Sequence, residues 1–208
     1  MRNAIRPKRV KIDRDLIEKY SIRGPRYTSY PTAPVWTEAV GQDQYVDHIK
    51  RSNAAGCQRP LSMYVHIPFC SERCYYCACN VIISPQPEIG ERYVESLIQE
   101  IDLVAPHVSE ERKVVQLHFG GGTPTFLSPE MLRRLLTHMR SRFTFDPLGE
   151  KSIEVDVRVT TEEHLNVLRE FGFNRISFGV QDFSKETQEA IRRVQSAMAT
   201  HNFISMCR

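Results

Sequence analysis

The arrangement of apolar positions along the chain changes near residue 61. Before it, apolar side chains recur at helical spacing only in two short stretches, 13–20 and 45–49. The segment after Tyr20 and through Pro34 is rich in Gly, Pro and Tyr, a composition typical of extended chain rather than of a packed element. The pattern therefore predicts an amino-terminal extension, or arm, over residues 1–60.

After residue 61, segments with a buried-strand pattern alternate with segments of helical spacing. Strands are expected at Leu61–Ile67, Val114–Phe119, Ile153–Val157 and Arg175–Val180. Helices are expected at 94–104, from Ser128, from Thr161 to Gly172, and from Ser184 to about Val194. Four such pairs in succession predict parallel strands joined by right-handed crossovers. The expected fold class is α/β, a partial parallel (β/α) barrel with its first four βα units over 61–195.

Residues that are typical of functional sites come directly after these strands. They are Cys70–Cys79, Gly120–Gly122, Glu154–Asp156 and Gln181–Asp182. In barrels of parallel strands, binding and catalytic residues lie at the carboxyl ends of the strands. Core packing explains apolar residues inside strands, but it does not explain cysteines, glycines and acids just beyond them. The glycine run is expected to expose main-chain N–H groups to a ligand.

Composition and charge exclude several classes of protein. No apolar run approaches the ~20 residues that a membrane span needs, and the basic start of the chain lacks the apolar core of a signal peptide. A net charge of +3 is too small to indicate a nucleic-acid partner. Clustered cysteines without a secretory signal favour a reducing compartment, so we expect a cytoplasmic protein.

Four of the six cysteines lie within ten residues, at Cys70, Cys74, Cys77 and Cys79. Thiolates at C-x3-C-x2-C spacing on one loop can converge on a soft metal centre, and iron-sulfur clusters and zinc are the usual occupants. Structural zinc usually takes four ligands as two paired knuckles, and no second knuckle follows. The spacing therefore favours a 4Fe-4S cluster on Cys70, Cys74 and Cys77, with one iron lacking a protein ligand.

The residues around this loop carry a family resemblance. Tyr64–Cys70 and Gly120–Thr125, together with the three cysteines, resemble the radical S-adenosylmethionine (SAM) enzymes. Within that superfamily, Gly24–Ala33, Cys79 and Phe178–Phe183 resemble the oxygen-independent coproporphyrinogen III oxidases (dehydrogenases). The resemblance covers roughly residues 13 to 195 and consists of several ordered motifs.

The resemblance implies a 4Fe-4S cluster and SAM as cofactors. Cys70, Cys74 and Cys77 would bind the cluster, while Cys79 marks the oxidase branch and is a possible catalytic residue. The positions that match cofactor-binding residues of the family are Tyr64, Tyr76, Gly121, Gly122, Thr123, Glu154, Gln181 and Arg193. For three of these residues a purely structural role stays open. Glu154 could be a solvated acid, Arg193 a charge on a helix face and Cys79 a small buried side chain.

The activity that the resemblance implies is oxidative decarboxylation of coproporphyrinogen III to protoporphyrinogen IX in haem biosynthesis, with an electron donor, an electron acceptor and a monomeric full-length enzyme. Two rivals remain: a related radical SAM haem-binding chaperone without decarboxylase activity, and a zinc-stapled binding module. The family's carboxyl-terminal part is absent, so we expect a truncated, amino-terminal portion that is inactive alone. Two departures matter. Val157 replaces the family's usual proline, and the tail, 196–208, is expected to be divergent and irregular.

Overall fold

The computed structural model describes residues 13–22, 32, 35–54 and 59–208. Its contacts divide the chain into two units, 1–41 and 42–208, which are described separately. In the first unit, helix α1 (Arg14–Tyr20) begins where the Asp13 side chain accepts a hydrogen bond from the Leu16 N–H at 3.1 Å. The Gly24–Ala33 motif lies outside the described residues apart from Thr32. The expected boundary at residue 60, between the amino-terminal arm and the partial barrel, stays a prediction.

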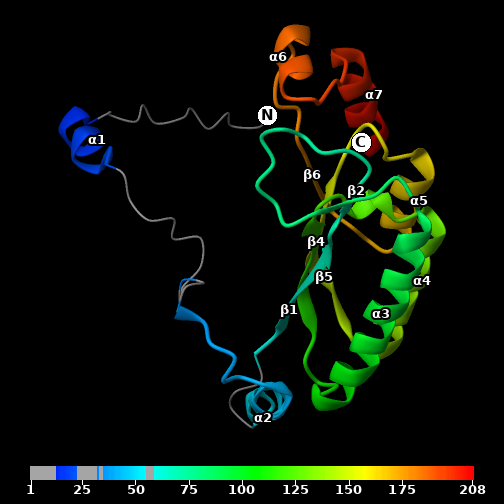
Figure 1. Ribbon diagram of the computed structural model, residues 1–208. Coiled ribbons are helices and arrows are strands. Elements are labelled where there is room, and N and C mark those ends of the chain that lie inside the picture. The colour runs from blue at the N-terminus through cyan, green and yellow to red at the C-terminus, as the bar shows by residue number, and fades with distance from the viewer. Residues whose placement is uncertain (1–12, 23–31, 33–34, 55–58) are drawn as a thin grey trace, which may run out of the picture. The chain divides into compact units, whose positions relative to one another are not determined.

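The second unit is built on four parallel strands in the order β1-β4-β5-β6 (Figure 1). They are β1 (Leu61–Ile67), β4 (Val114–Gly121), β5 (Phe145–Val155) and β6 (Arg175–Phe178). The order in the sheet follows the order in the chain, and every neighbouring pair is parallel. The predicted class, α/β with the first four units of a parallel barrel, is confirmed.

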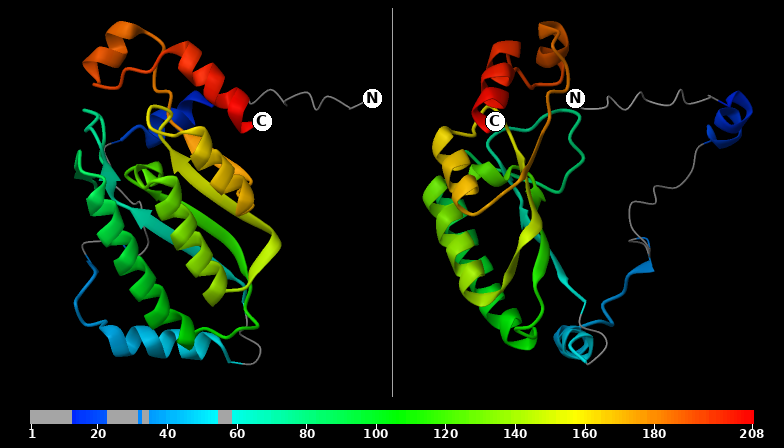
Figure 2. Two further views of the ribbon diagram at one scale, coloured as in Figure 1. Left: turned by 90° about the vertical axis from the view of Figure 1, so that its right-hand side faces the viewer. Right: turned by 180° about the vertical axis from the view of Figure 1, so that it is seen from behind.

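Helices α3 (Glu88–Val104), α4 (Pro129–Arg142) and α5 (Glu162–Glu170) lie on one face of the sheet (Figure 2). The core lies between them and the strands, where apolar side chains from both layers are fully or almost fully buried. The main members are Leu117, Phe119, Ile153, Leu132, Leu135, Leu136, Leu165 and Leu168. Burying one such side chain stabilises the fold by ~1.5–3 kcal/mol, so this layer fixes the sheet that carries the site.

The remaining elements are short or lie at the ends of the sheet. Helix α2 (Gln42–Ser52) precedes β1, and the 3-10 turns η2 (Ala105–His107) and η3 (Pro124–Phe126) follow α3 and β4. Beyond β6 come α6 (Lys185–Ala190) and α7 (Ala197–Cys207). Among the helices described, none is both long and apolar enough to cross a membrane.

The predicted helix starts at Ser128 and Thr161 are confirmed. Ser128 caps α4 by accepting from the Met131 N–H at 3.3 Å, and Pro129 occupies the first helical position. Thr161 caps α5 in a reciprocal arrangement in which Nδ1 of His164 accepts from the Thr161 N–H at 3.1 Å. The His164 Nε2 therefore carries the proton and donates to the Leu127 carbonyl at 2.9 Å. These caps fix where the helices begin after each strand-end loop.

Strand β5 differs from its prediction at both ends. It begins at Phe145 rather than Ile153, although Pro147 and Gly149 are unfavourable in strands. A Cβ on Gly149 would lie 2.7 Å from the Val115 carbonyl oxygen, so glycine allows the two backbones to approach where the register shifts. The strand ends at Val155 because the chain turns at Asp156, whose carbonyl accepts hydrogen bonds from the N–H groups of Val159 and Thr160.

The last two helices also differ from their predictions. Helix α6 ends at Ala190 instead of about Val194, because Arg192 takes a left-handed φ of +54° and reverses the chain. The expectation of an irregular 196–208 tail is wrong. Ser196 caps α7 by accepting from the Ala199 N–H at 3.0 Å, and the Phe203 ring packs edge-on against Phe178 at 5.2 Å. Phe203 of this helix thus packs against the end of β6 and joins the core.

We expect Phe203→Ala to lower the free energy of unfolding by ~3–5 kcal/mol, because the Phe203 side chain is only 2% exposed and leaves a cavity when truncated. Met198→Ala in the same helix is the control, since Met198 is exposed and should change stability by less than ~0.5 kcal/mol. Equilibrium urea denaturation of both variants is the measurement. Equal losses would mean that α7 does not pack through Phe203.

Candidate functional site

The cysteine loop is anchored at the carboxyl end of the sheet. After β1, the short strand β2 (Phe69–Cys70) pairs with β3 (Ile82–Ile83), which closes the loop between them. The Ile82 N–H donates to the Pro68 carbonyl at 2.7 Å. Figure 1 shows this cyan-green loop, with α6 and α7, at the end where the strands terminate. The loop therefore has a fixed base, as a site at a barrel mouth requires.

All four clustered cysteines line one cavity of about 430 Å³. Cys74 is buried, Cys70 and Cys77 are half-buried, and Cys79 is exposed at the rim. Gly122, Thr123, Tyr76, Asp156, Arg158 and Arg193 line the same cavity. The structure thus brings the three predicted cluster ligands to a single space, together with several predicted cofactor-binding residues.

The cysteines are not arranged as ligands of one ion. In the part of the chain that the structure describes, no three His, Cys, Asp or Glu side chains are placed to hold a single metal ion together. A closed zinc site needs four ligands on one ion. In an iron-sulfur cube each thiolate binds a different iron, so its ligands stand further apart. A cube on three cysteines remains the prediction of the C-x3-C-x2-C spacing.

Burial sets the protonation of two of these thiols. Burial raises the pKa of Cys70, although a hydrogen bond with the Thr123 hydroxyl at 3.3 Å opposes the shift. Burial and the neighbouring Cys77 raise the pKa of Cys79. Both groups are therefore neutral thiols at pH 7 without a metal, and a metal that binds Cys70 displaces its proton.

A buried carboxylate forms the floor of the cavity. Asp156, only 6% exposed, follows the last residue of β5 and accepts from two arginines. Nη2 of Arg158 lies 2.7 Å from Oδ2, and Nη1 of Arg193 lies 3.1 Å from the same atom. Burial alone would raise the pKa of Asp156, but the hydrogen bonds from Arg158 and the charge of Arg193 hold it below its usual value. The group is ionised at neutral pH.

Both arginines also reach the cysteine loop. Nη2 of Arg158 lies 3.9 Å from the Cys74 Sγ, and Nη1 of Arg193 lies 3.8 Å from it. Nη2 of Arg193 donates to the Gly179 carbonyl at 3.2 Å. The Nε of Arg193 is buried and has no hydrogen-bond partner among the described residues. This buried donor is free to bond to a polar group of a ligand in the cavity.

A second cavity of about 290 Å³ adjoins the first and shares part of its wall. Its lining includes Gly122, Thr123, Glu154, Gln181 and Arg193, which are five of the predicted cofactor-binding residues. Gln181 has a left-handed φ of +67°, and its side-chain amide lies against Gly179. A strained non-glycine residue in a cavity wall is typical of a functional site.

The glycine run does not offer the N–H groups that were expected. The Gly122 N–H donates to the Ile67 carbonyl at 2.8 Å, and the Thr123 N–H donates to the Phe69 carbonyl at 2.8 Å. A Cβ on Gly121, whose φ is +116°, would lie 2.9 Å from the Ile67 oxygen. The expectation is corrected for Gly122 and Thr123, whose N–H groups are already bonded, and Gly121 and Gly122 let β4 approach β1 and the loop.

Tyr64 and Glu154 belong to a polar network across the sheet. The Tyr64 hydroxyl and the His66 Nδ1 are 2.9 Å apart, and the Tyr64 ring stacks on His118 at 5.8 Å. Nδ1 of His118 lies 2.8 Å from the Ser152 hydroxyl, and its Nε2 lies 3.7 Å from Glu154. Burial, with the charge of Glu154, raises the pKa of Tyr64. The two histidines are thus paired side chains that support predicted cofactor-binding residues.

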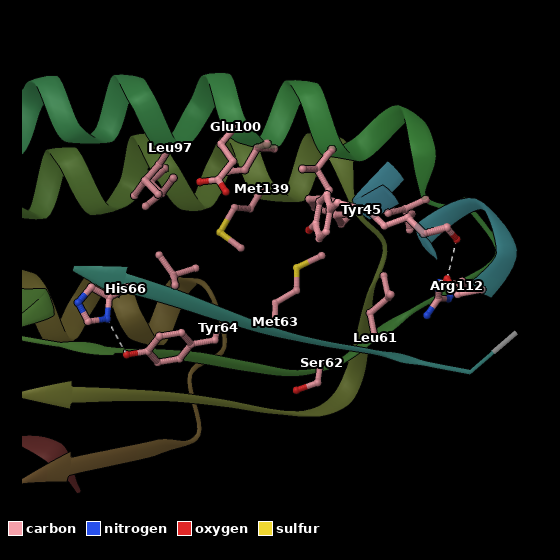
Figure 3. Close-up of a pocket in the computed structure, with 18 of the residues that line it drawn as sticks. Tyr45, Leu61, Ser62, Met63, Tyr64, His66, Leu97, Glu100, Arg112 and Met139 are labelled. Carbon is pink, nitrogen blue, oxygen red and sulfur yellow. Dashed lines mark hydrogen bonds between the residues drawn. The ribbon is translucent and has the colours of Figure 1, made fainter. Parts of the chain in front are cut away.

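A larger cavity of about 520 Å³ lies elsewhere, at the β1 edge of the sheet (Figure 3). Met63 of β1, Leu97 of α3 and Met139 of α4 point into it, and Tyr45 of α2 closes one end. Tyr64 and His66 lie at its rim, but none of the clustered cysteines lines it. Of the predicted residues, Gly121 lines none of these three cavities.

Comparison with known proteins decides the family. The model of the radical SAM superfamily matches residues 64–208. The chain belongs to this superfamily. Radical SAM proteins use a 4Fe-4S cluster and SAM. The 430 Å³ cavity fits such a pair of cofactors, because it holds the three predicted ligand thiols and the Arg193 Nε, which has no partner among the described residues. The match extends through the 196–208 helix, in agreement with its place in the core.

Within the radical SAM superfamily, the chain is similar to oxygen-independent coproporphyrinogen III oxidases. It is 45% identical to that of Pseudomonas aeruginosa over 96% of this chain and 43% of the relative. It is 46% identical to that of Escherichia coli over 88% of this chain and 39% of the relative. The solved structure of coproporphyrinogen III oxidase from Escherichia coli, a radical SAM enzyme, matches with a TM-score of 0.85 at 42% identity, covering 96% of this chain and 43% of that one. The chain therefore spans less than half the length of these relatives.

Sequence reasoning missed Arg158. The Glu154–Asp156 motif was recognised, but the arginine two residues beyond Asp156 was not. An acid and an arginine two positions apart at the end of a strand are the signal that could have found it, because both can bond within one turn.

We expect Asp156→Asn to lower the free energy of unfolding by ~3–5 kcal/mol, because it leaves two guanidinium groups without their buried anion. Glu154→Gln, on the same strand end, is the control: Glu154 is half-exposed, and its loss should cost less than ~1 kcal/mol. Urea denaturation at several pH values is the measurement.

The pH dependence has a definite sign. The folded-state pKa of Asp156 is lowered, so its contribution is present above the unfolded value of ~3.9 and is lost as the pH falls below it. The loss of stability between about pH 5 and pH 3 should thus be shallower in Asp156→Asn than in the wild type. Parallel pH profiles for the two proteins would contradict the pairing of this carboxylate.

Proposed function

We propose that this chain takes part in the oxidative decarboxylation of coproporphyrinogen III to protoporphyrinogen IX, in haem biosynthesis. The observation that carries the proposal is the joining of two cavities, one lined by the clustered cysteines and one by Glu154, Gln181 and Arg193. The named activity of relatives that are 45–46% identical supports the choice of substrate.

In this proposal Cys70, Cys74 and Cys77 would hold the 4Fe-4S cluster, and the residues of the adjoining second cavity would bind SAM. When bound, the cluster and SAM supply a reductively generated carbon radical that takes a hydrogen atom from a substrate propionate. The propionate then releases carbon dioxide and one electron and becomes a vinyl group, so an electron donor and a separate acceptor are needed. Two propionates react for each substrate molecule.

The side chains of this chain bind and orient the cofactor. The unpartnered Nε of Arg193 can donate to an anionic group of SAM, and the Glu154 carboxylate can accept from ribose hydroxyls. Gln181 can bond to polar groups in the same cavity. Because Gly122 and Thr123 have already committed their N–H groups, their part is to leave room for the cofactor beside the loop. Tyr76 lines the cluster cavity, and Tyr64 stacks on His118, whose Nε2 lies near the Glu154 carboxylate.

Cys79 separates the oxidase from the related haem-binding chaperone. Its thiol lines the cluster cavity and is exposed, unlike that of Cys74, which supports a role in contacting the substrate. This position favours the oxidase and makes Cys79 a candidate to contact the substrate. We place the reaction in the cytoplasm and expect a monomeric full-length enzyme.

We expect Cys70→Ala, Cys74→Ala and Cys77→Ala each to abolish binding of a full 4Fe-4S cluster, because three thiolates are needed to leave only one iron open. Cys79→Ala, on the same loop, is the matched control and should keep all four irons. The measurement is iron and sulfide content with the visible absorption spectrum after anaerobic reconstitution. A Cys77→Ala protein that retains a full cluster contradicts the ligand assignment.

The activity is tested by anaerobic incubation of the reconstituted chain with a reductant, SAM and coproporphyrinogen III. The proposal expects 5′-deoxyadenosine to form from SAM, and to form faster when the porphyrinogen is present. Since the chain spans under half of its relatives, we expect little release of protoporphyrinogen. A chain with a full 4Fe-4S cluster that binds no SAM would refute the proposed function. A chain that cleaves SAM at the same rate with and without the porphyrinogen would refute the proposed substrate.

A further inference from the structure

Arg158 is a charged side chain in the cluster cavity to which the proposed function gives no role. It lines the cavity beside Asp156, and its Nη2 lies 3.9 Å from the Cys74 Sγ, where it can donate a hydrogen bond to sulfur. Cys74 is the most buried of the clustered cysteines. A contact between a guanidinium and a buried sulfur is weakly screened by water, so its electrostatic effect is large.

The position of Arg158 is tightly fixed. Its Nε lies 3.0 Å and 3.2 Å from the two carboxylate oxygens of Asp156, and its Nη2 lies 2.7 Å from Oδ2. Its own main-chain N–H donates to Asp156 Oδ1 at 3.0 Å, while Nη1 lies 3.7 Å from Glu72 in the cysteine loop. The hydrogen bonds with Asp156 raise the pKa of Arg158 above its ordinary value, so the charge is permanent.

A fixed cation that donates to a ligand sulfur stabilises the form of a cluster that carries more negative charge. Reduction adds one electron to the cluster and therefore makes the cluster more negative. Hydrogen bonds to cysteine sulfurs and nearby charge are known to set the reduction potential of iron-sulfur centres. Arg158 should thus make the cluster easier to reduce.

We propose that Arg158, positioned by Asp156, raises the reduction potential of the 4Fe-4S cluster through its contact with the Cys74 sulfur. The inference rests on the proposed cluster, and it adds a tuning residue that contacts a ligand of the cluster but need not touch SAM or the substrate. Arg193 lies as close to the same sulfur, but it also faces the SAM cavity, so its replacement would change two properties at once.

The test is Arg158→Gln, which removes the charge but keeps a polar side chain of medium length. After anaerobic reconstitution and an iron count, the midpoint potential is measured by a redox titration followed by electron paramagnetic resonance, in the absence of SAM. At the wild-type midpoint we expect the ratio of reduced to oxidised cluster to fall about tenfold, a shift of about 59 mV to more negative potential for one electron. Arg158→Lys keeps the positive charge but loses the planar set of guanidinium N–H donors, so it should give a smaller shift in the same direction.

The matched control is Arg175→Gln. It removes the same charge from an exposed arginine of β6, which pairs with Glu150 of β5. Its potential should equal that of the wild type. An Arg158→Gln protein with four irons and an unchanged potential overturns the inference. Failure of both Arg158 variants to take up a cluster overturns it as well, because a tuning residue is dispensable for assembly. A wild-type chain that binds no cluster would instead refute the proposed function, so the two failures are distinguishable.

Discussion

The site depends on one buried carboxylate. Asp156 accepts from Arg158 and Arg193, and through these two arginines it connects the end of β5 with the cysteine loop and with the turn after α6. Two guanidinium groups share this one buried carboxylate, and Glu72, which lies 3.7 Å from Arg158, is exposed, so positive charge predominates next to Cys74. That excess favours an anionic cluster at this point, and it would be costly to bury without a negatively charged partner. The same interaction therefore assembles the cavity and sets its electrostatic character.

The rest of the unit serves to bring this carboxylate and the cysteines together. The helices on one face of the sheet hold the four strands in register, and the strand ends then deliver their loops to one edge. Gly121 and Gly122 let the end of β4 pack against β1 and the loop. The left-handed residues Gln181 and Arg192 turn the chain so that Arg193 points back into the cavity. Both strained positions lie next to the site, where local strain is compatible with function.

Much of this could be predicted from the sequence, because it depends on local patterns. Three of the four strand starts, the caps at Ser128 and Thr161 and the gathering of the cysteines follow from spacing and residue type. The features that were missed depend on partners far along the chain. The early start of β5 depends on the backbone of Val115, which lies beside Gly149. Helix α7 is held in place by the contact between Phe203 and Phe178. The contact between Arg158 and Cys74 spans 84 positions, so no local pattern reveals it.

The central claim is that this cavity holds a 4Fe-4S cluster on three cysteines and leaves one iron open to SAM. Mössbauer spectroscopy of the chain reconstituted with ⁵⁷Fe, recorded with and without SAM, tests that claim most directly. The account predicts one iron in four with its own signal, and a change in that signal alone when SAM is added. Four irons whose signals do not respond to SAM would contradict it, because they would show a closed cluster with a fourth ligand such as Cys79.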